Sequence, residues 1–431
     1  MGCPLAELAI ALIMLCTGAT NAMFNKIMYQ TKGYTDKGVL ANYDKPWFST
    51  LVMFIGEVFC MVMYVTCCIY YKIVKPSESE EKKDSGLENS QEEEESSEEK
   101  KRKEEQKFMP QKVQLTFVTR QEAAENPTGG LNWKYPFCVI AFSSFDLLSF
   151  TFAGIGLVYC NASVIQILRG FVIVFTMLFS WAFLHRKPTL YQVSGVLIAI
   201  VGLILVGGSA VGSEATAAHG GKIFPAKALI GIGITLLGQI FSALQLVLEE
   251  KVLKGVIRPV HPLFLVGSEG ISGTILMICV AFPIVKKIKG SDNGSLEDWR
   301  NAVYMTFHIK QVEIITLVSI VTIAIFNWAS NMYTKYVSAT TRSLVDALRT
   351  IVVWVTMAIV YYVSDHQYGE GLTYWSIMEA VSFLLMLFGT SVHNNINELG
   401  FWLINKFCCC FVDIDDAFHK DETTPVETSE V

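Results

Sequence analysis

The sequence predicts an all-α polytopic membrane protein with ten transmembrane helices arranged as two inverted five-helix repeats. Two observations support this prediction: ten apolar segments have the length that a bilayer requires, and one short motif occurs twice at a fixed separation. The composition agrees, because 52% of the 431 residues are hydrophobic and 17% are charged, whereas a soluble protein has about 25% charged residues. The net charge of −6, without a basic stripe, argues against a nucleic-acid partner.

Each predicted span has roughly 20 mostly apolar residues, enough to cross the hydrocarbon core. The interiors are rich in Leu, Ile, Val, Phe and Gly, and Trp and Tyr stand near the ends, as interfacial aromatic residues do. In chain order the spans are 5–28, 47–71, 135–158, 162–184, 190–210, 227–249, 262–284, 313–334, 343–363 and 372–393. The lipid bilayer is therefore the first predicted partner.

Polar segments divide these spans into groups. Residues 75–133 carry blocks of Glu, Lys and Ser that bury too little apolar surface to fold, so we expect a disordered acidic cytosolic loop. This loop separates helices one and two (1–74) from helices three to five (134–212) of the first repeat. The second repeat, helices six to ten, covers 226–394, and 395–431 form a polar cytosolic tail.

An even number of spans puts both termini and the acidic loop on one side of the membrane. Lysine and arginine do not decide which side, because their numbers nearly balance once the long loop is left out. A glycosylation sequon at Asn293, between helices seven and eight, does. A glycan on Asn293 makes that loop lumenal and the termini cytosolic.

The eleven cysteines predict neither a disulfide framework nor a metal site, since most stand singly in apolar runs and act there as small hydrophobic residues. The triplet Cys408, Cys409 and Cys410 is either a lipidation site for S-palmitoylation or an interfacial apolar cluster. No histidine lies deep in a span, and no Walker, G-x-S-x-G or H-E-x-x-H motif occurs. We therefore expect no cofactor, no metal and no enzymatic activity.

The repeated motif lies in helices four and nine. Residues 168–177 and 348–357 share Leu, Arg, Val, Thr and Met at a constant offset of 180 residues. Two five-helix copies are inverted relative to each other, because an odd number of spans separates equivalent positions. Inverted repeats are typical of alternating-access transporters, with the binding site near the midplane.

Arginine inside a span is costly and normally faces a cavity or a counter-charge. Arg169 and Arg349 lie about equally deep in helices four and nine. In one interpretation both face a central substrate cavity and bind an anionic group of the solute. In the other, each forms an intramembrane ion pair, Arg169 with Asp146 and Arg349 with Asp346. Asp346 lies three residues before Arg349, so that pair can form within one helix.

Three acids inside spans are candidates for proton coupling, because desolvation favours the neutral form of a carboxyl group. They are Glu57 in helix two, Asp146 in helix three and Glu269 in helix seven, with Glu57 preferred. The alternative is a structural hydrogen bond to a neighbouring helix. Glu249 and Glu250, at the end of helix six, are expected to be interfacial.

Amide side chains complete the predicted substrate cavity. Gln166 precedes Arg169 by about one helical turn, and Asn327 begins a polar stripe in helix eight. Asn21 belongs to a run of small and polar residues in helix one. Such residues either line a polar path or let helices approach closely, and both interpretations are open.

Four strings resemble the drug/metabolite transporter superfamily, and within it subfamily F of the solute carrier 35 family, which is related to nucleotide-sugar transporters and the chloroquine-resistance transporter. These strings are Trp47–Cys60, Asn161–Ser180, Leu248–Gly273 and Tyr336–Trp354. The resemblance implies the ten-helix fold, a central cavity, cytosolic termini and an endomembrane location, lysosome or vacuole or Golgi. It places Glu57, Asp146, Gln166, Arg169, Asp346 and Arg349 in matching motifs.

The favoured function is a secondary-active transporter of a small organic solute, of the metabolite, amino acid, peptide or nucleotide-sugar class, with or without proton coupling. The alternative is a membrane-embedded interaction protein that recruits partners through its acidic loop and tail. The substrate and the oligomeric state stay open, a homodimer being one option.

Overall fold

The computed structural model describes residues 4–74, 133–159, 168–217, 226–254, 260–290, 292–363 and 374–395. Several predicted features lie outside these ranges: Gln166, nearly all of the acidic loop, and the tail with Cys408, Cys409 and Cys410. The predictions for them, including recruitment of partners by the loop and tail, stay predictions.

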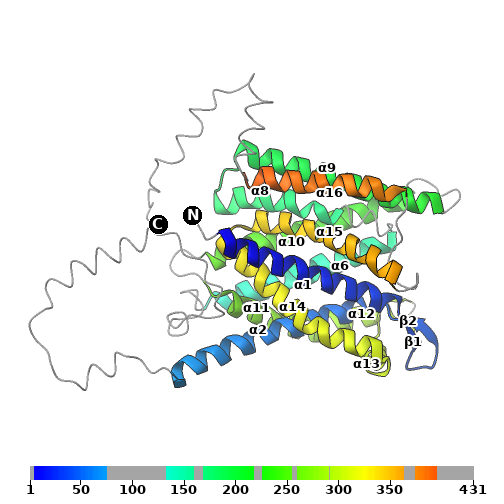
Figure 1. Cartoon of the computed structure of the whole chain (residues 1–431). Helices are drawn as coiled ribbons and strands as arrows, with labels where there is room; N and C mark the ends of the chain where they lie inside the picture. The colour runs from blue at the N-terminus through cyan, green and yellow to red at the C-terminus, as the bar shows by residue number, and fades with distance from the viewer. Residues whose placement is uncertain are drawn as a thin grey trace, which may run out of the picture.

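Helices dominate the described chain (Figure 1). They are α1 (Pro4–Gln30), α2 (Pro46–Val74), α6 (Tyr135–Tyr159), α8 (Val172–Leu184), α9 (Leu190–Ala217), α10 (Ala226–Leu253), α11 (Pro262–Leu276), the π-helical turn η1 (Met277–Ala281), α12 (Phe282–Lys287), α13 (Trp299–His308), α14 (Lys310–Tyr336), α15 (Ala339–Val363) and α16 (Trp375–His393). A short antiparallel hairpin, β1 (Lys32–Tyr34) and β2 (Leu40–Asn42), joins α1 to α2.

Eight helices in the described ranges are long and apolar enough to cross a membrane. Two shorter apolar helices, Leu168–Leu184 and Leu190–Leu205, coincide with the predicted fourth and fifth spans. These helices confirm the prediction of a helical, multi-pass membrane protein. A helix can cross lipid because it satisfies its own backbone hydrogen bonds. The total of ten spans stays a prediction.

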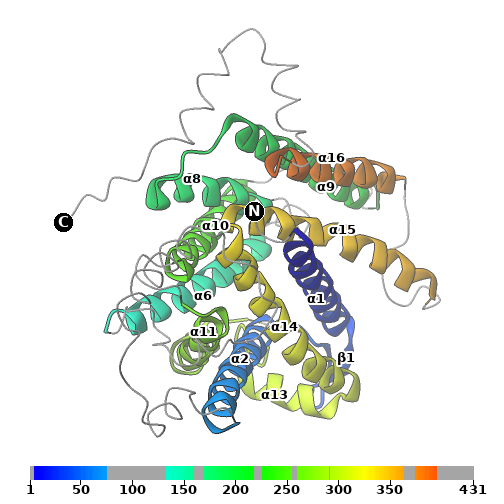
Figure 2. The ribbon, with the colours of Figure 1, turned by 60° about the vertical axis from the view of Figure 1, so that its left-hand side comes forward.

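The helices pack in pairs that join the first half of the chain to the second (Figures 1 and 2). The main pairs are α1 with α14, α2 with α11, α6 with α10, and α9 with α16. Helix α8 packs against both α10 and α15. The two halves are therefore intermingled, and any space at the centre of the bundle is bounded by helices from both.

A stripe of glycines lets α11 lie close against α2. Gly267, Gly270 and Gly273 all face α2, and a Cβ atom on Gly270 would lie only 2.5 Å from the backbone nitrogen of Val58. Small residues at a helix contact let two backbones approach in this way. The contact brings Glu57 of α2 beside α11, since the same Cβ atom would lie 2.6 Å from the Cβ of Glu57.

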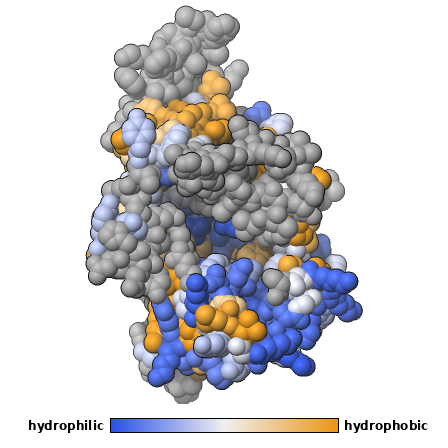
Figure 3. All heavy atoms as spheres, turned by 90° about the vertical axis from the view of Figure 1, so that its right-hand side faces the viewer, coloured by the Kyte–Doolittle hydropathy of each residue, from blue (hydrophilic) through white to orange (hydrophobic). Residues whose placement is uncertain are grey.

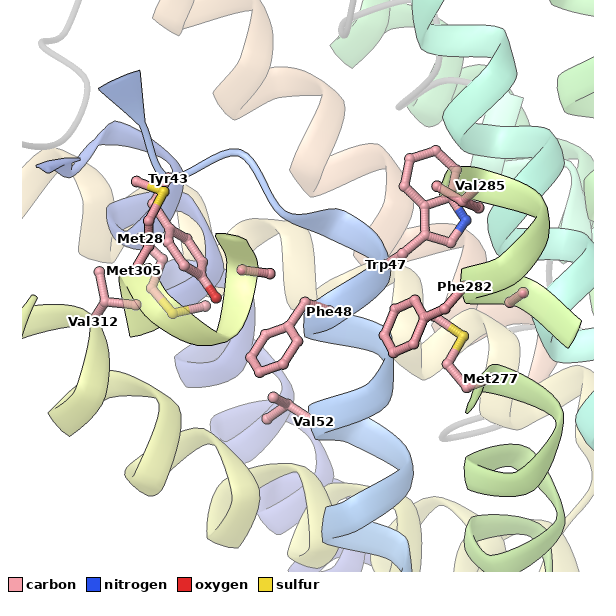
Figure 4. Close-up of a cluster of buried hydrophobic side chains, with 12 residues drawn as sticks. Met28, Tyr43, Trp47, Phe48, Val52, Met277, Phe282, Val285, Met305 and Val312 are labelled. Carbon is pink, nitrogen blue, oxygen red and sulfur yellow. The ribbon is translucent and has the colours of Figure 1, made fainter. Parts of the chain in front are cut away.

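One end of the bundle carries structure that the sequence did not predict. The hairpin and α13 cover this end, which we call the hairpin end. Buried side chains fix them to the membrane helices (Figure 4); these are Met28, Tyr43, Trp47, Phe48, Val52, Met277, Phe282, Val285, Met305 and Val312. The Tyr43 hydroxyl also lies 2.7 Å from that of Thr306 in α13.

Buried charges hold the start of α2 at the hairpin end. The carboxylate of Glu297 accepts hydrogen bonds from the backbone N–H groups of Trp47 and Phe48, at 3.0 and 2.8 Å. These donors have no partner within the helix, and they favour a negative charge. Beside them, Lys45 pairs with Asp292 at 2.5 Å, both side chains being largely buried.

Candidate functional site

A polar cavity of about 260 Å³ lies among α2, α6, α8, α10, α11, α14 and α15. Five carboxyl groups and two guanidinium groups line it, together with amides, hydroxyls and a few apolar side chains. The lining residues are Met53, Glu57, Asp146, Val172, Ser242, Gln245, Leu246, Glu249, Glu269, Phe326, Asn327, Asn331, Arg342, Ser343, Asp346 and Arg349. Figure 3 shows a hollow with hydrophilic residues at the centre of the hairpin-end face.

Six of the predicted site residues meet in this cavity, although they come from five helices. They are Glu57, Asp146, Glu269, Asn327, Asp346 and Arg349. Ionisable groups inside a membrane normally face such cavities, because lipid solvates charge poorly. The convergence makes this cavity the candidate substrate site.

Glu57 is almost completely buried, with 6% of its surface exposed. Its Oε1 accepts a hydrogen bond of 2.6 Å from the Asn327 side-chain amide. Its Oε2 is buried and accepts none from the described residues, and the same holds for Oε1 of Glu269. The predicted bond to a neighbouring helix therefore exists for Glu57, yet it satisfies only one of the two oxygens.

Arg349 and Asp346 form the ion pair that their spacing allows, with Nη2 and Oδ2 3.2 Å apart. The Arg349 guanidinium also lies 5.3 Å from the centre of the Phe326 ring, within the range of a cation–π interaction. Both partners line the cavity and stay partly exposed, at 30% and 37%. The two interpretations of Arg349 are thus compatible, because one residue can pair with Asp346 and also face a solute.

Arg169 lies beside the cavity residues, although it is not among those that line the cavity in the described structure. Its side chain is exposed, and it interacts electrostatically with Arg349, Tyr29 and Asp346. The described charges that act on Asp146 are those of Glu249 and Arg342. The structure therefore gives no support to the predicted pairing of Arg169 with Asp146.

Asn21 faces a second, smaller cavity of about 110 Å³ toward the hairpin end. Asn25, Tyr29 and Tyr43 line the same space, together with side chains of α2 and α14. Asn21 therefore lines a polar space, but a different one from the six residues above.

The expectation that Glu249 and Glu250 are interfacial is wrong, since only 1% and 0% of their surfaces are exposed. Glu249 lines the cavity and receives a hydrogen bond of 3.1 Å from Arg342, which also donates to Thr334. The error arose because an acid at the end of an apolar run usually reaches water, whereas here α15 covers it.

Glu250 forms a separate network at the end of α10. It binds Arg186 at 2.7 Å and Lys254 at 2.8 Å, and it accepts a bond of 2.8 Å from the backbone N–H of Ala339. Lys254 in turn donates to the Val337 carbonyl at 2.6 Å. These contacts tie α10, the segment after α8 and the start of α15 together.

Comparison with known proteins adds a family context. Residues 114–208 match the model of the EamA-like transporter family. Solute carrier family 35 member F6 of Homo sapiens is 32% identical over 291 residues, which cover 65% of this chain and 74% of that protein. The same protein of Rattus norvegicus is 33% identical, over 62% of this chain and 69% of that protein. An uncharacterized protein of Schizosaccharomyces pombe is 28% identical, over 58% of this chain and 72% of that protein.

Proposed function

The chain belongs to solute carrier family 35, and from this premise we propose that it is a secondary-active transporter that moves a small organic solute by alternating access. The family relationship and the apolar helices support a membrane transporter of small solutes. The observation that carries the finer proposal is the central cavity, where charged groups of both halves of the chain meet. Binding at the interface of two repeats is how such carriers work.

The pattern of helix contacts supports ten spans in two inverted repeats. The proposed equivalent helices are α1 and α10, α2 and α11, α6 and α14, α8 and α15, and α9 and α16. Exchanging them converts the contact of α1 with α14 into that of α10 with α6. It likewise converts α1 with α15 into α10 with α8, and α2 with α14 into α11 with α6, and all six contacts occur. A packing pattern that survives this exchange is expected of two copies of one unit.

In this proposal the hairpin end faces the lumen of an endomembrane compartment, and both termini are cytosolic. The start of α1 lies at the opposite end from the hairpin (Figure 1), and the sequon residue Asn293 lies at the hairpin end. The Asn293 side chain donates a 2.9 Å hydrogen bond to Asp36 in the hairpin loop. The lysosome or vacuole, the Golgi and a homodimer stay predictions.

Proton coupling through Glu57, Asp146 and Glu269 belongs to the same proposal. These carboxyls line the cavity, and Glu57 and Glu269 are largely shielded from solvent. Arg349 and Asp346 are proposed to contact the solute directly, because their pair is partly exposed. Arg169 is placed at the edge of the same path.

Uptake into liposomes tests the proposal. The purified chain is reconstituted and offered labelled amino acids, short peptides, nucleotide sugars and organic cations, with and without a pH gradient. We expect saturable uptake of one class, loss of uptake in Arg169→Ala, and loss of the gradient dependence in Glu57→Gln. Glu379→Gln is the matched control, since Glu379 is also an acid within a span but bonds to Trp354 and Ser209, away from the cavity. Folded protein that takes up no class of solute would refute a transporter function.

A further inference from the structure

We propose that the central cavity binds an ammonium group of its solute between Glu57 and Glu269, and that this binding releases one of the protons that the two carboxyls otherwise hold. The inference rests on the proposed transport function, and it names the chemical group that the cavity recognises. It follows from three features of the described residues: the pairing of charges, the kind of unsatisfied atoms, and the distance between α2 and α11.

The charges that line the cavity are unequally paired. Arg342 is bonded to Glu249 at 3.1 Å, and Arg349 to Asp346 at 3.2 Å. These two pairs use both guanidinium groups of the lining. Glu57, Asp146 and Glu269 are left without an ion pair among the described residues, so the cavity has a surplus of acid.

The unsatisfied atoms of the lining are all hydrogen-bond acceptors. Oε2 of Glu57, Oε1 of Glu269, Oδ1 of Asn331 and Oδ1 of Asp346 are buried and receive no hydrogen bond from the described residues. Buried acceptors without donors are costly, and the cost is higher for charged groups. A primary ammonium group offers three donors and no acceptor. A carboxylate or phosphate would add acceptors and negative charge, and would therefore fit this part of the cavity poorly.

The closeness of α2 and α11 links ammonium binding to protons. Gly270 brings the two helices together at the level of Glu57, and Glu269 is its neighbour in sequence. Two desolvated carboxyl groups that share a site cannot both carry a charge without a nearby cation. When one ammonium group enters, one carboxyl ionises and gives up its proton, so the net charge of the cavity does not change. The step exchanges one proton for one ammonium group: the O–H bond of that carboxyl breaks, its proton passes to water, and no other covalent bond changes.

The ammonium group has two chemical sources: an amine without a carboxylate, or the α-ammonium of an amino acid. A matched series on one side chain separates them. Leucinamide carries only the ammonium, leucine carries both charges, and N-acetyl-leucine carries only the carboxylate. Putrescine adds a second ammonium without a side chain.

The experiment measures affinity by titration calorimetry on the full chain in detergent micelles, with proton release followed by a pH indicator in weak buffer. We expect at least one ammonium compound to bind with release of protons, and N-acetyl-leucine to bind roughly 10- to 100-fold more weakly or not at all. If leucinamide and putrescine bind as well as leucine does, the cavity is an amine site. If leucine alone binds, the cavity is an amino acid site. Tightest binding by N-acetyl-leucine, or no binding by any ammonium compound, overturns the inference.

Variants place the binding. Glu57→Gln and Glu269→Gln should each weaken ammonium binding roughly 10- to 100-fold and reduce proton release, whereas Glu379→Gln should behave like the wild type. Unchanged affinity and proton release in both cavity variants overturn the inference. Thermal melting of each variant shows that it is folded. Binding needs no flux, so an ammonium compound that binds but is never taken up by liposomes refutes the transporter and leaves the binding site standing.

Discussion

Glu297 should make the stability of the hairpin end depend on pH. Only 2% of this residue is exposed, and burial raises the pKa of Glu297 to about 7. The hydrogen bonds from Trp47 and Phe48 and the charge of Lys45 oppose this effect, while Asp292 adds to it. The pKa of the Glu297 carboxyl therefore lies near 7, whereas that of an exposed glutamate lies near 4.5.

The sign of the effect follows from the raised pKa. The folded state holds the proton up to about pH 7, whereas the unfolded state loses it near pH 4.5, so the folded state binds more protons between these values. The stabilisation is complete below pH 4.5 and is lost as the pH rises through 7. A rise of the pKa from 4.5 to about 7 corresponds to roughly 3 kcal/mol. Acidic conditions therefore stabilise this end of the protein.

Thermal melting of the wild type and Glu297→Gln between pH 4.5 and pH 8 checks this. Glutamine resembles the protonated carboxyl in shape and charge, so the variant should lack the pH-dependent contribution of this group. As the pH rises from 4.5 to 8, the free energy of unfolding of the variant should increase relative to that of the wild type by up to about 3 kcal/mol. Other groups that titrate in this window affect both proteins alike. Parallel melting profiles of the two proteins would refute the argument.

Three further perturbations test other parts of the structure. Exchanging Arg349 and Asp346 should change stability by less than about 1 kcal/mol but abolish uptake; full uptake would make the pair purely structural. Glu250→Ala should lower the free energy of unfolding by roughly 1–3 kcal/mol, because it leaves the buried Ala339 N–H and the partly buried Lys254 ammonium without their acceptor, and a loss below about 1 kcal/mol in a denaturant titration would contradict the network. Gly270→Ala should cost about 1–3 kcal/mol by forcing α2 and α11 apart. Gly233→Ala, whose added Cβ would have no neighbour within 4 Å beyond the adjoining backbone of its own helix, should cost nothing in the same assay.

Hydropathy predicted the membrane helices well because each must fill the bilayer with apolar side chains. The apolar runs also made Glu57, Asp346 and Arg349 easy to identify as candidate site residues. A charged residue inside such a run is rare and has to face a polar group or a cavity. Which of these residues share one cavity could not be predicted in this way. That depends on how far each helix is rotated toward its neighbours, which packing decides.

Residues near helix ends were harder, because charge is ordinary there. Glu249 was expected to be interfacial and Arg342 was not singled out, yet contact between α10 and α15 places both in the cavity wall. The hairpin and α13 were missed for a related reason. Strands of three residues are too short to show a period, and α13 is too short and too polar overall to stand out among the membrane spans. Both are held by the cluster that surrounds Tyr43 and Met305.

The two acids at the end of α10 connect the cavity to one end of the bundle. Neighbouring residues on a helix point about 100° apart, so Glu249 faces the cavity while Glu250 faces Arg186 and Lys254. Both nevertheless bind the first turn of α15, Glu249 through the Arg342 side chain and Glu250 through the backbone of Ala339. A movement of that turn away from α10 must therefore break both contacts together. Separating α10 from α15 at this end would then also free a cation and an acid in the cavity wall, and the proposed alternating access requires such a link between one end of the bundle and the cavity.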